Sequence, residues 1–267
     1  MSRSGQLPRL PGGLPDPIDA VILPGGQIGQ VWRARLADGA TVVVKETGYD
    51  ARLEAEGLDA LRAAGGPVPR VVAVDADVLV LEHVSGPGDL RTLGAALATI
   101  HRDIGDAYGW HRDNVIGPLH QPNAPAEDWA EFHAEQRLRT HLDVLPVDLA
   151  RRLGNAIEDG RIAGVLDHEP PASLVHGDLW WGNVIDDRWL IDPAVHRADR
   201  EVDLAMLELF GPIPATFKRG YAEVWPLPDG WQRRRPALQL WPLLVHVRLF
   251  GAGYLGGVAA RLDQLGW

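Results

Sequence analysis

The stretch Leu174–Asp192, with the sequence LVHGDLWWGNVIDDRWLID, decides the fold of this chain. It contains an aspartate, Asp178, an asparagine five residues later, Asn183, and a second aspartate, Asp192. Between Asn183 and Asp192 the pattern predicts two short strands joined by a turn at residues 186–188. Closing that hairpin returns Asp192 to the end that carries Asn183. The sequence therefore predicts three oxygen-bearing side chains at one place.

Among the His-x-Asp triplets of the chain, only one has an asparagine at the required distance. In catalytic loops for phosphoryl transfer, the aspartate accepts the proton of the attacking hydroxyl and an asparagine five residues on binds Mg²⁺. Five residues beyond Asp103 stands a tyrosine, and five beyond Asp113 a proline. We therefore predict that Asp178 is the catalytic base. Asp103 and Asp113 are expected at the surface or as caps, and His176 is expected to be a packed residue of the loop.

Asn183 and Asp192 would supply the oxygen ligands that a metal-bridged triphosphate requires. Mg²⁺ in such sites takes one or two carboxylates from the protein and completes its coordination with phosphate oxygens and water. We therefore predict that Asn183 and Asp192 hold Mg²⁺ and that the phosphate donor is ATP. The neighbouring Asp186 and Asp187 are expected to serve only the hairpin turn.

The N-terminal part of the chain contains the residues that would complete a nucleotide site. Gly25, Gly26 and Gly29 fall where the first hairpin is expected to turn, so the backbone there could approach phosphate groups closely. Lys45 ends a strand expected over residues 41–45, about one hairpin later. It is one of two lysines in a chain otherwise rich in arginine. A lysine on a flexible stem suits contact with phosphates.

Lys45 needs a carboxylate to hold it, and the helix expected after it offers two. Glu54 shares one helical face with Leu58 and Leu61, at spacings i, i+4 and i+7. Glu56 points to the other side, so we expect it to face outward. Because the face with the leucines must be the buried one, Glu54 is predicted to be the partner of Lys45.

The composition changes at a break rich in glycine and proline, Ser85–Asp89, which is the expected hinge. Residues 1–84 show short strand patterns around one helix, which predicts a small antiparallel-sheet lobe. Residues 90–267 show mostly helical spacing, which predicts a helical lobe. The main-chain groups of Glu82 and Val84, just before the hinge, would hydrogen-bond adenine. The predicted fold class is α+β, a two-lobed protein-kinase-like fold.

The bulk properties limit the classes of function. The chain has 267 residues and a net charge of −10, which disfavours nucleic acid or an anionic membrane as the partner. It has no cysteine, which excludes disulfides, thiolate nucleophiles and cysteine-bound metals. No run approaches about 18 apolar residues and the N-terminus lacks a secretory signal, so we expect no membrane partner and a cytoplasmic location. None of these numbers predicts an oligomeric state.

We call Leu174–Asp192 the catalytic stretch. Together with five other segments of the chain, it resembles the fructosamine kinase (ketosamine kinase) family, in the aminoglycoside-phosphotransferase-like branch of the kinase fold. The Asp-Asn-Asp core identifies only the superfamily, whereas the longer strings are more specific. The resemblance covers the chain from about Val21 to its end. The matching strings are Leu174–Asn183, Ile191–Ala194, Asp203–Gly211, Gly109–Asn123, Trp129–Asp143 and Arg234–Leu255.

The resemblance implies transfer of the γ-phosphate of ATP to a sugar hydroxyl of a ketoamine, commonly the 3-hydroxyl. The phosphorylated adduct then falls apart and frees the amine, which is a deglycation repair. The expected partner is a small-molecule ketoamine or a glycated amine or protein. Two other functions stay open: a kinase for another small hydroxyl substrate (an aminoglycoside, a sugar or an amino alcohol), and a nucleotide-binding pseudokinase.

The sequence departs from the family pattern on what would be the acceptor side. Trp181 stands where the family usually has serine or glycine, and His-Arg-Ala-Asp at residues 196–199 replaces a Tyr-Tyr-Gly-His-like segment. Pro212 replaces a usual glycine and Val245 a common asparagine. The residues predicted for phosphoryl transfer are intact. Trp181 next to Asp178 predicts a small pocket and therefore a preference for adducts of shorter sugars.

Four residues are candidates for the walls of the acceptor site: Asn114, Trp180, Trp181 and His246. The tryptophans would offer apolar or cation–π faces to the amine arm of a ketoamine. An aminoglycoside pocket would need many carboxylates near the cleft, and Trp181 offers none. A ketoamine is therefore the favoured acceptor.

Overall fold

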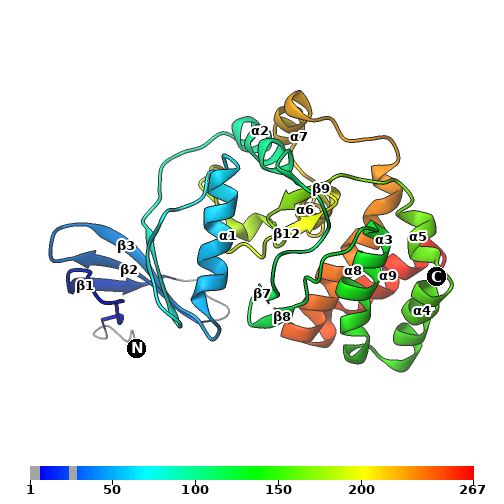
Figure 1. Ribbon diagram of the computed structural model, residues 1–267, viewed down its shortest axis with the longest axis horizontal. Coiled ribbons are helices and arrows are strands. Elements are labelled where there is room, and N and C mark those ends of the chain that lie inside the picture. The colour runs from blue at the N-terminus through cyan, green and yellow to red at the C-terminus, as the bar shows by residue number, and fades with distance from the viewer. Residues whose placement is uncertain (1–6, 24–28) are drawn as a thin grey trace.

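The computed structural model describes residues 7–23 and 29–267, which form a sheet at one end and a helical body at the other (Figure 1). The sheet has five antiparallel strands in the order β1-β2-β3-β5-β4, with helix α1 beside it. The predicted α+β fold is confirmed. The elements of this part are β1 (Pro17–Ile22), β2 (Gln30–Leu36), β3 (Thr41–Glu46), α1 (Ala51–Ala63), β4 (Val71–Val74) and β5 (Val78–Glu82).

The β2–β3 hairpin determines on which face of the sheet Lys45 lies. It turns through Asp38 and Gly39, as predicted, and Gly39 has a φ of +89° that glycine adopts without strain. Side chains along β3 alternate between the two faces of the sheet. Val42 and Val44 are buried in a cluster on one face. Lys45 is therefore on the opposite face, towards α1.

Helix α1 brings a carboxylate to that face. It begins at its N-cap Asp50, whose side chain accepts a hydrogen bond from the Arg52 amide at 3.1 Å. The face predicted to be buried is buried, since Leu58 and Leu61 have no exposed surface. Glu54 lies on this face and is only 3% exposed. The helical periodicity thus places Glu54 between the sheet and the helical body.

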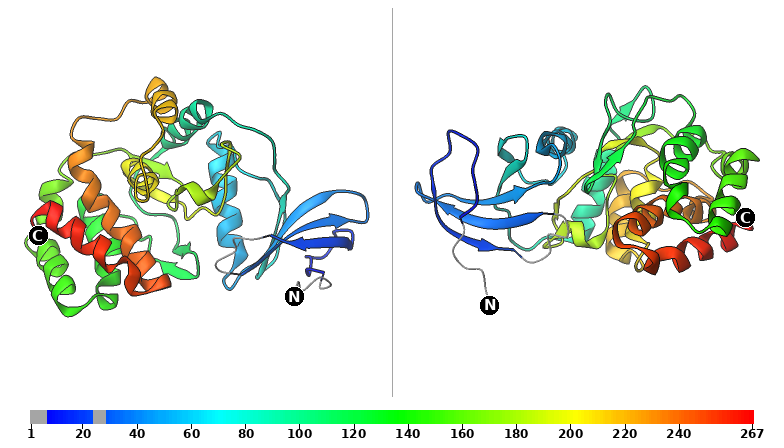
Figure 2. Two further views of the ribbon diagram at one scale, coloured as in Figure 1. Left: turned by 180° about the vertical axis from the view of Figure 1, so that it is seen from behind. Right: turned by 90° about the horizontal axis from the view of Figure 1, so that it is seen from below.

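Most of the remaining helices pack around one large apolar core, whereas α2 and α7 pack in a second apolar cluster that they share with α1. Figure 2 shows these helices from two further sides. They are α2 (Leu90–His101), α3 (Trp129–Phe132), α4 (Val147–Glu158), α5 (Arg161–Val165), α6 (Glu201–Leu207), α7 (Ala215–Val224), α8 (Trp231–Phe250) and α9 (Leu255–Leu265). The segment that begins with α3 is not one continuous α-helix, because α3 is followed by a π-helical turn and then a 3-10 turn. The π-helical turn carries Arg137, which is 1% exposed. Across the described ranges, we find no helix long and apolar enough to cross a membrane.

Short strands in the middle of the molecule position the catalytic stretch (Figure 1). The predicted hairpin between Asn183 and Asp192 is confirmed and turns through Asp186 and Asp187. Both turn residues have a φ of +54°, a conformation that aspartate tolerates better than most residues. The paired strands are β9 (Ala172–Val175) with β6 (Ile104–Gly105) and β12 (His196–Ala198), β10 (Val184–Ile185) with β11 (Trp189–Leu190), and β7 (Asn114–Ile116) with β8 (Leu119–Gln121).

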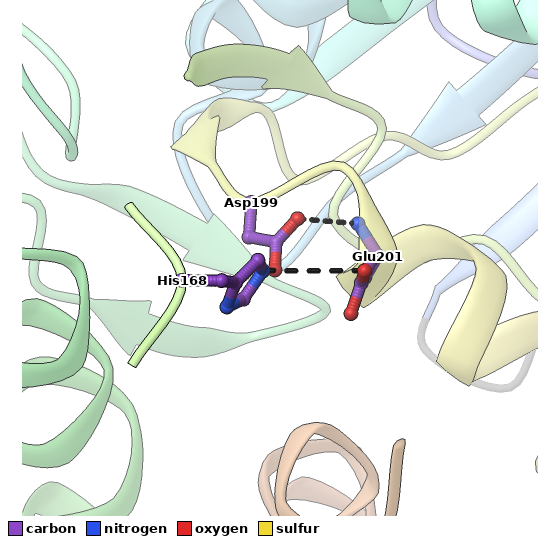
Figure 3. A group of neighbouring side chains, drawn as sticks. All are labelled: His168, Asp199 and Glu201. Carbon is purple, nitrogen blue, oxygen red and sulfur yellow. Dashed lines mark hydrogen bonds and ion pairs between the residues drawn. The ribbon is translucent and has the colours of Figure 1, made fainter. Parts of the chain in front are cut away.

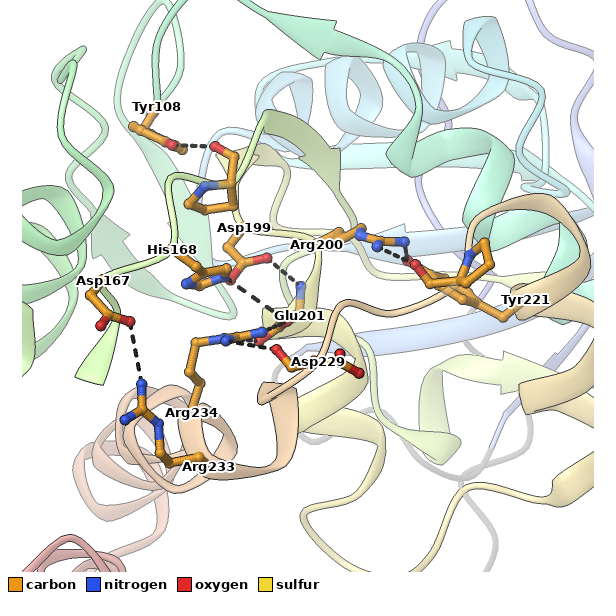
Figure 4. Close-up of polar contacts among 12 residues, drawn as sticks. Tyr108, Asp167, His168, Asp199, Arg200, Glu201, Tyr221, Asp229, Arg233 and Arg234 are labelled. Carbon is orange, nitrogen blue, oxygen red and sulfur yellow. Dashed lines mark hydrogen bonds and ion pairs between the residues drawn. The ribbon is translucent and has the colours of Figure 1, made fainter. Parts of the chain in front are cut away.

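A buried polar network joins the start of α6 to α8 and to the loop after α5 (Figure 3). His168 contacts Asp199 at 2.8 Å, and Glu201 accepts two hydrogen bonds from Arg234, at 2.8 and 2.5 Å. Arg200 extends the network to a main-chain carbonyl beyond α7 (Figure 4). The side-chain atoms of His168, Asp199 and Glu201 that could bind a metal ion lie within 4.8 Å of one another. Since Arg234 already balances the charge of Glu201, we assign this network a structural role and not that of a metal site.

Helices α2 and α7 lie side by side with their backbones in contact (Figures 1 and 2). Two glycines make this approach possible. A Cβ at Gly94 would lie 2.2 Å from the carbonyl oxygen of Phe217, and a Cβ at Gly220 would lie 1.8 Å from that of Arg91. Any side chain at either position would push the helices apart. The hinge over residues 85–89, which leads into α2, stays a prediction.

We expect Gly220→Ala to destabilise the protein by about 1–3 kcal/mol, because the added methyl group overpacks a backbone contact. Urea unfolding followed by circular dichroism measures the change. Gly256→Ala is the matched control. A Cβ at Gly256 in α9 meets no atom within 4 Å, so the substitution should be neutral or stabilise by up to about 1 kcal/mol. Equal stability of the two variants would contradict the packing argument.

Candidate active site

Lys45 on β3 is held by two carboxylates. Its ammonium lies 2.8 and 2.7 Å from the two oxygens of Glu54 on α1, and 3.0 Å from Oδ1 of Asp192. Burial by itself lowers the pKa of Lys45, but the negative charges of Asp192 and Glu54 outweigh it and hold the pKa well above its ordinary value. The structure therefore contains the predicted pair of Lys45 and Glu54, and the lysine is charged.

Tyr49, which the sequence analysis missed, completes this cluster. Its hydroxyl donates a hydrogen bond to Oε2 of Glu54 at 2.6 Å. Burial and the negative charge of Glu54 both raise the pKa of Tyr49, so the hydroxyl stays protonated and remains a donor. The residue lies in the loop between β3 and α1, five positions before Glu54. No helical or strand spacing relates the two positions, so no sequence pattern predicts the contact.

The carboxylates that the sequence analysis set aside serve other contacts. Glu56, expected to face outward, instead accepts a hydrogen bond from Nε1 of Trp110 at 2.7 Å, because α1 packs beside the loop that follows β6. Asp113 accepts a main-chain hydrogen bond at 2.8 Å, and Asp103 pairs with Arg197 at 2.8 Å. All three carboxylates hold loops of the helical body in place.

Asp178 and Asn183 lie together in the catalytic stretch. The Asn183 amide donates to the carbonyl oxygen of Asp178 at 2.8 Å and to its Oδ2 at 3.3 Å. Burial raises the pKa of Asp178 to about 7, with a further contribution from the negative charge of Asp192. A carboxylate with such a pKa can accept a proton near neutral pH.

The loop that carries Asp178 is fixed by a buried carboxylate that the sequence analysis did not single out. Asp203 on α6 accepts main-chain hydrogen bonds from His176 at 2.7 Å and from Gly177 at 2.9 Å, and its Oδ2 lies 3.1 Å from Nε2 of His101. Burial alone would raise the pKa of Asp203, but the hydrogen bond to His101 and the charges around it hold the pKa below its ordinary value. His176 is fully buried and contacts the main chain, as expected.

Asp192 has the surroundings of a metal ligand. It follows β11 with a φ of +56°, and the Ile191 amide donates to the Asn183 carbonyl at 3.1 Å. The hairpin thus brings Asp192 back beside Asn183, as predicted. The Asp192 carboxylate is 44% exposed and the Asn183 amide uses its nitrogen towards Asp178, which leaves two hard oxygen donors. This donor set fits Mg²⁺.

The predicted contacts to the nucleotide are described only in part. Gly25 and Gly26 fall on residues outside the described ranges. Gly29 has a φ of +117°, and a Cβ there would lie 2.3 Å from the carbonyl oxygen of Glu46, so the start of β2 requires glycine. The Glu82 side chain pairs with an arginine at 2.8 Å at the end of β5, and Val84 stands two residues later. Their role in binding adenine stays a prediction.

Two of the four candidate acceptor residues contact the protein interior. Asn114 is 5% exposed, and its amide donates to the Val195 carbonyl at 2.7 Å, so it is a structural residue. Trp181 packs edge-on against Phe217 of α7, with ring centroids 5.8 Å apart. The structure corrects the assignment of Asn114, whose amide is used inside the protein. Trp181 is partly buried against α7, and its role at the acceptor stays a prediction. The preference for shorter sugars that rests on Trp181 stays a prediction as well.

Trp180 and His246 belong to a partly exposed aromatic patch. Phe210 lies between them, with its ring centroid 6.4 Å from that of Trp180 and 5.4 Å from that of His246. Phe250 and Tyr254 extend the patch beyond His246. The exposed fraction is 54% for Phe210 and 43% for Phe250. We call these five residues the aromatic patch, and it begins two residues after Asp178.

The chain is similar to proteins named as kinases of ketoamines. It is 38% identical over 248 residues to a probable ketoamine kinase of Thermus thermophilus, covering 90% of this chain and 91% of the relative. It is 36% identical over 264 residues to the probable ketoamine kinase YniA of Escherichia coli K12, with 91% of each chain covered. These lengths show that the similarity extends well beyond the catalytic stretch.

Solved structures of kinases are also similar to this chain. A Thermobifida fusca protein provisionally assigned as a fructosamine-3-kinase superposes with a TM-score of 0.85 at 36% identity, over 94% of each chain. A macrolide 2'-phosphotransferase of Brachybacterium faecium superposes with a TM-score of 0.55 at 18% identity, which shows a shared fold alone. The family model described as fructosamine kinase matches residues 18–266. The chain therefore belongs to the fructosamine kinase family and is a phosphotransferase that acts on a hydroxyl group.

Proposed function

We propose that this protein uses ATP to phosphorylate a sugar hydroxyl of a ketoamine, and that it thereby removes sugars from glycated amines. The observation that carries the proposal is the arrangement of Lys45, held by Glu54, near Asp192, with Asp178 and Asn183 beside them. This is the set that phosphoryl transfer needs: a cation for the phosphates, oxygen ligands for a metal and a base for the hydroxyl. Membership of the family supports a ketoamine as the acceptor.

The residues of this chain would act mainly by position and charge. The ammonium of Lys45, fixed by Glu54, would bind phosphate oxygens and orient the γ-phosphoryl group. Asp178 would accept the proton of the acceptor hydroxyl while the new O–P bond forms and the bond from the γ-phosphorus to the bridging oxygen breaks. Asn183 holds the Asp178 side chain through its amide at 3.3 Å.

Asp192 and Asn183 are the residues that would hold Mg²⁺. When bound, a Mg²⁺ ion would neutralise negative charge on the phosphate oxygens. Asp192 also contacts Lys45 at 3.0 Å, which supports a shared role of the two residues at the phosphates. This arrangement would keep the phosphates between two positive charges.

We expect Asp178→Asn to lower kcat by about 100-fold or more while leaving ATP affinity within a few-fold, because the base contacts the acceptor and not the nucleotide. Release of ADP measures turnover, and equilibrium titration with ATP measures affinity. Asp113→Asn is the control, since Asp113 only holds a loop. A comparable loss in Asp113→Asn, or none in Asp178→Asn, would show that another group is the base.

Lys45→Met and Glu54→Gln should each raise the KM for ATP by about 10-fold or more, and the double variant should be little worse than either, because the two residues act as one unit. Glu56→Gln is the matched control on the same helix and should change the KM less than about two-fold. Circular dichroism confirms that each variant folds. Additive effects of the two substitutions would count against the pair.

Tyr49→Phe should raise the KM for ATP by less than about 10-fold, because it removes one hydrogen bond to Glu54 and leaves the ion pair with Lys45 in place. The same steady-state assay measures it. In a Glu54→Gln background the substitution should have little further effect. A full effect in that background would mean that Tyr49 acts independently of Glu54.

The acceptor should be a ketoamine on an amine, with free fructose or ribose a poor substitute. The panel for ADP release contains ribuloselysine, fructoselysine, the free sugars and aminoglycosides, ranked by kcat/KM. Trp180→Ala should lower kcat/KM for ketoamines by about 10-fold, and Trp180→Phe should retain most of it, because an aromatic face suffices for a cationic arm. Turnover of an aminoglycoside without turnover of any ketoamine would overturn the acceptor assignment and favour a kinase for another hydroxyl substrate.

A further inference from the structure

A second polar cavity lies outside the cluster around Lys45 and Asp178. It has a volume of about 460 Å³ and opens between the end of α6, the loop that follows it, and helices α7, α8 and α9. Five of its lining residues matter here: Glu208 at the end of α6, Lys218 on α7, Arg235 and Gln239 on α8, and Arg261 on α9. None of them has a role in the mechanism above.

The cavity has more positive than negative charge. Glu208 is the one carboxylate among the residues that line it, and it pairs with Lys218 at 2.7 Å and with Arg235 at 2.5 Å. Arg261 is a third cation. The cavity therefore has two unbalanced positive charges, although the whole chain has a net charge of −10. Such a local excess of positive charge attracts anions to the cavity.

Arg261 is held in a fixed orientation, and no carboxylate of the described residues pairs with it. Its Nε donates to Oε1 of Gln239 at 2.7 Å. Gln239 is 2% exposed and its own amide nitrogen donates to the Ala205 carbonyl at 2.9 Å, so the acceptor is fixed in the core. Arg235 and Arg261 line the same cavity. Burial and the positive charge of Arg235 both lower the pKa of Arg261. An anion bound between these two cations would offset their like charges.

We propose that this cavity is an oxyanion-binding site, in which Arg261, Arg235 and Lys218 bind a phosphate group or a group of carboxylates. The planar guanidinium matches the geometry of such oxyanions, and the terminal nitrogens of Arg261 donate no hydrogen bond to any of the described residues. The site stands independently of the ketoamine assignment, because it is built from residues that the phosphoryl-transfer mechanism does not use.

The cavity is connected to the aromatic patch through one short loop. Gly211 lines the cavity, and its neighbour Phe210 contacts Trp180 and His246 in the patch. An anion in the cavity would therefore fix the loop that supports the proposed acceptor side. The oxyanion has two possible sources. It is either a group carried by the acceptor's own amine, or a separate anion that binds beside the acceptor.

The binding test uses inorganic phosphate and citrate at constant ionic strength, with saturating Mg²⁺ and ADP to occupy the nucleotide site. Isothermal titration should give a saturable site, and Arg261→Gln and Lys218→Gln should each weaken its Kd by about 10-fold. Arg261→Lys should weaken it less, because it keeps the charge. The control is Arg219→Gln on α7, one residue from Lys218 and outside the lining of the cavity; it should change the Kd less than about two-fold.

Two results would overturn the site: no saturable binding of either anion, or an equal loss in Arg219→Gln. Lys218→Gln keeps the test decisive if Arg261→Gln does not fold, since the Lys218 side chain is 46% exposed. The comparison between variants holds even if the nucleotide does not bind. Failure of the proposed kinase activity and failure of the anion site are therefore distinguishable.

Kinetics then identify the source of the oxyanion. If the acceptor carries it, Arg261→Gln should lower kcat/KM about 10-fold for a ketoamine whose amine bears a carboxylate or phosphate, and spare the same ketoamine with that group esterified. If a separate anion binds, added phosphate should change kcat/KM for the esterified ketoamine in the wild-type protein and not in Arg261→Gln. Both outcomes support the site, whereas an equal effect of Arg261→Gln on both ketoamines without any response to phosphate argues against it.

Discussion

The site depends on keeping the ammonium of Lys45 charged in a place with little water. A buried, unpaired cation costs several kcal/mol, so the fold must supply carboxylates in good geometry. Glu54 does so with both oxygens and Asp192 with one. These partners come from α1 and from the turn after β11, so one charge requirement links the sheet to the catalytic stretch. Glu54 is engaged with Lys45 and Tyr49, whereas the exposed Asp192 keeps an oxygen for another cation.

The same physical rule fixes the catalytic loop. Asp203 is a buried carboxylate whose charge is satisfied by two main-chain amides of the loop and by His101. His101 is the last residue of α2, and α2 cannot move away from α7 without breaking the contact that Gly94 and Gly220 allow. The packing of two helices distant from Lys45 therefore helps to position Asp178. Stability and catalysis are connected here through hydrogen bonds to a buried charge.

The parts of the site that could be predicted from the sequence are those that obey a local spacing rule. The loop from Asp178 to Asn183, the hairpin to Asp192 and the helical face of Glu54 all depend on residues fewer than fifteen positions apart. The contacts that were missed or corrected follow no such rule. Asp203 reaches a loop 26 and 27 residues away, and the direction of Trp181 depends on a helix that follows much later. Glu56 accepts a hydrogen bond from Trp110, which is 54 residues later in the chain.

The phosphate side and the acceptor side of the proposed reaction differ in the same way, since local spacing determines the first and contacts between distant segments determine the second. The phosphate side consists of charged pairs whose geometry is set by strand alternation, helix periodicity and one hairpin, so a change there disturbs several elements at once. The proposed acceptor side consists of rings from three segments, Trp180, Phe210 and His246 with its neighbours, which contact one another. Ring contacts tolerate substitution better than buried charges do. Acceptor choice can therefore change by exchange of side chains in the aromatic patch and the adjoining loop, while Lys45, Asp178 and Asp203 keep the same positions.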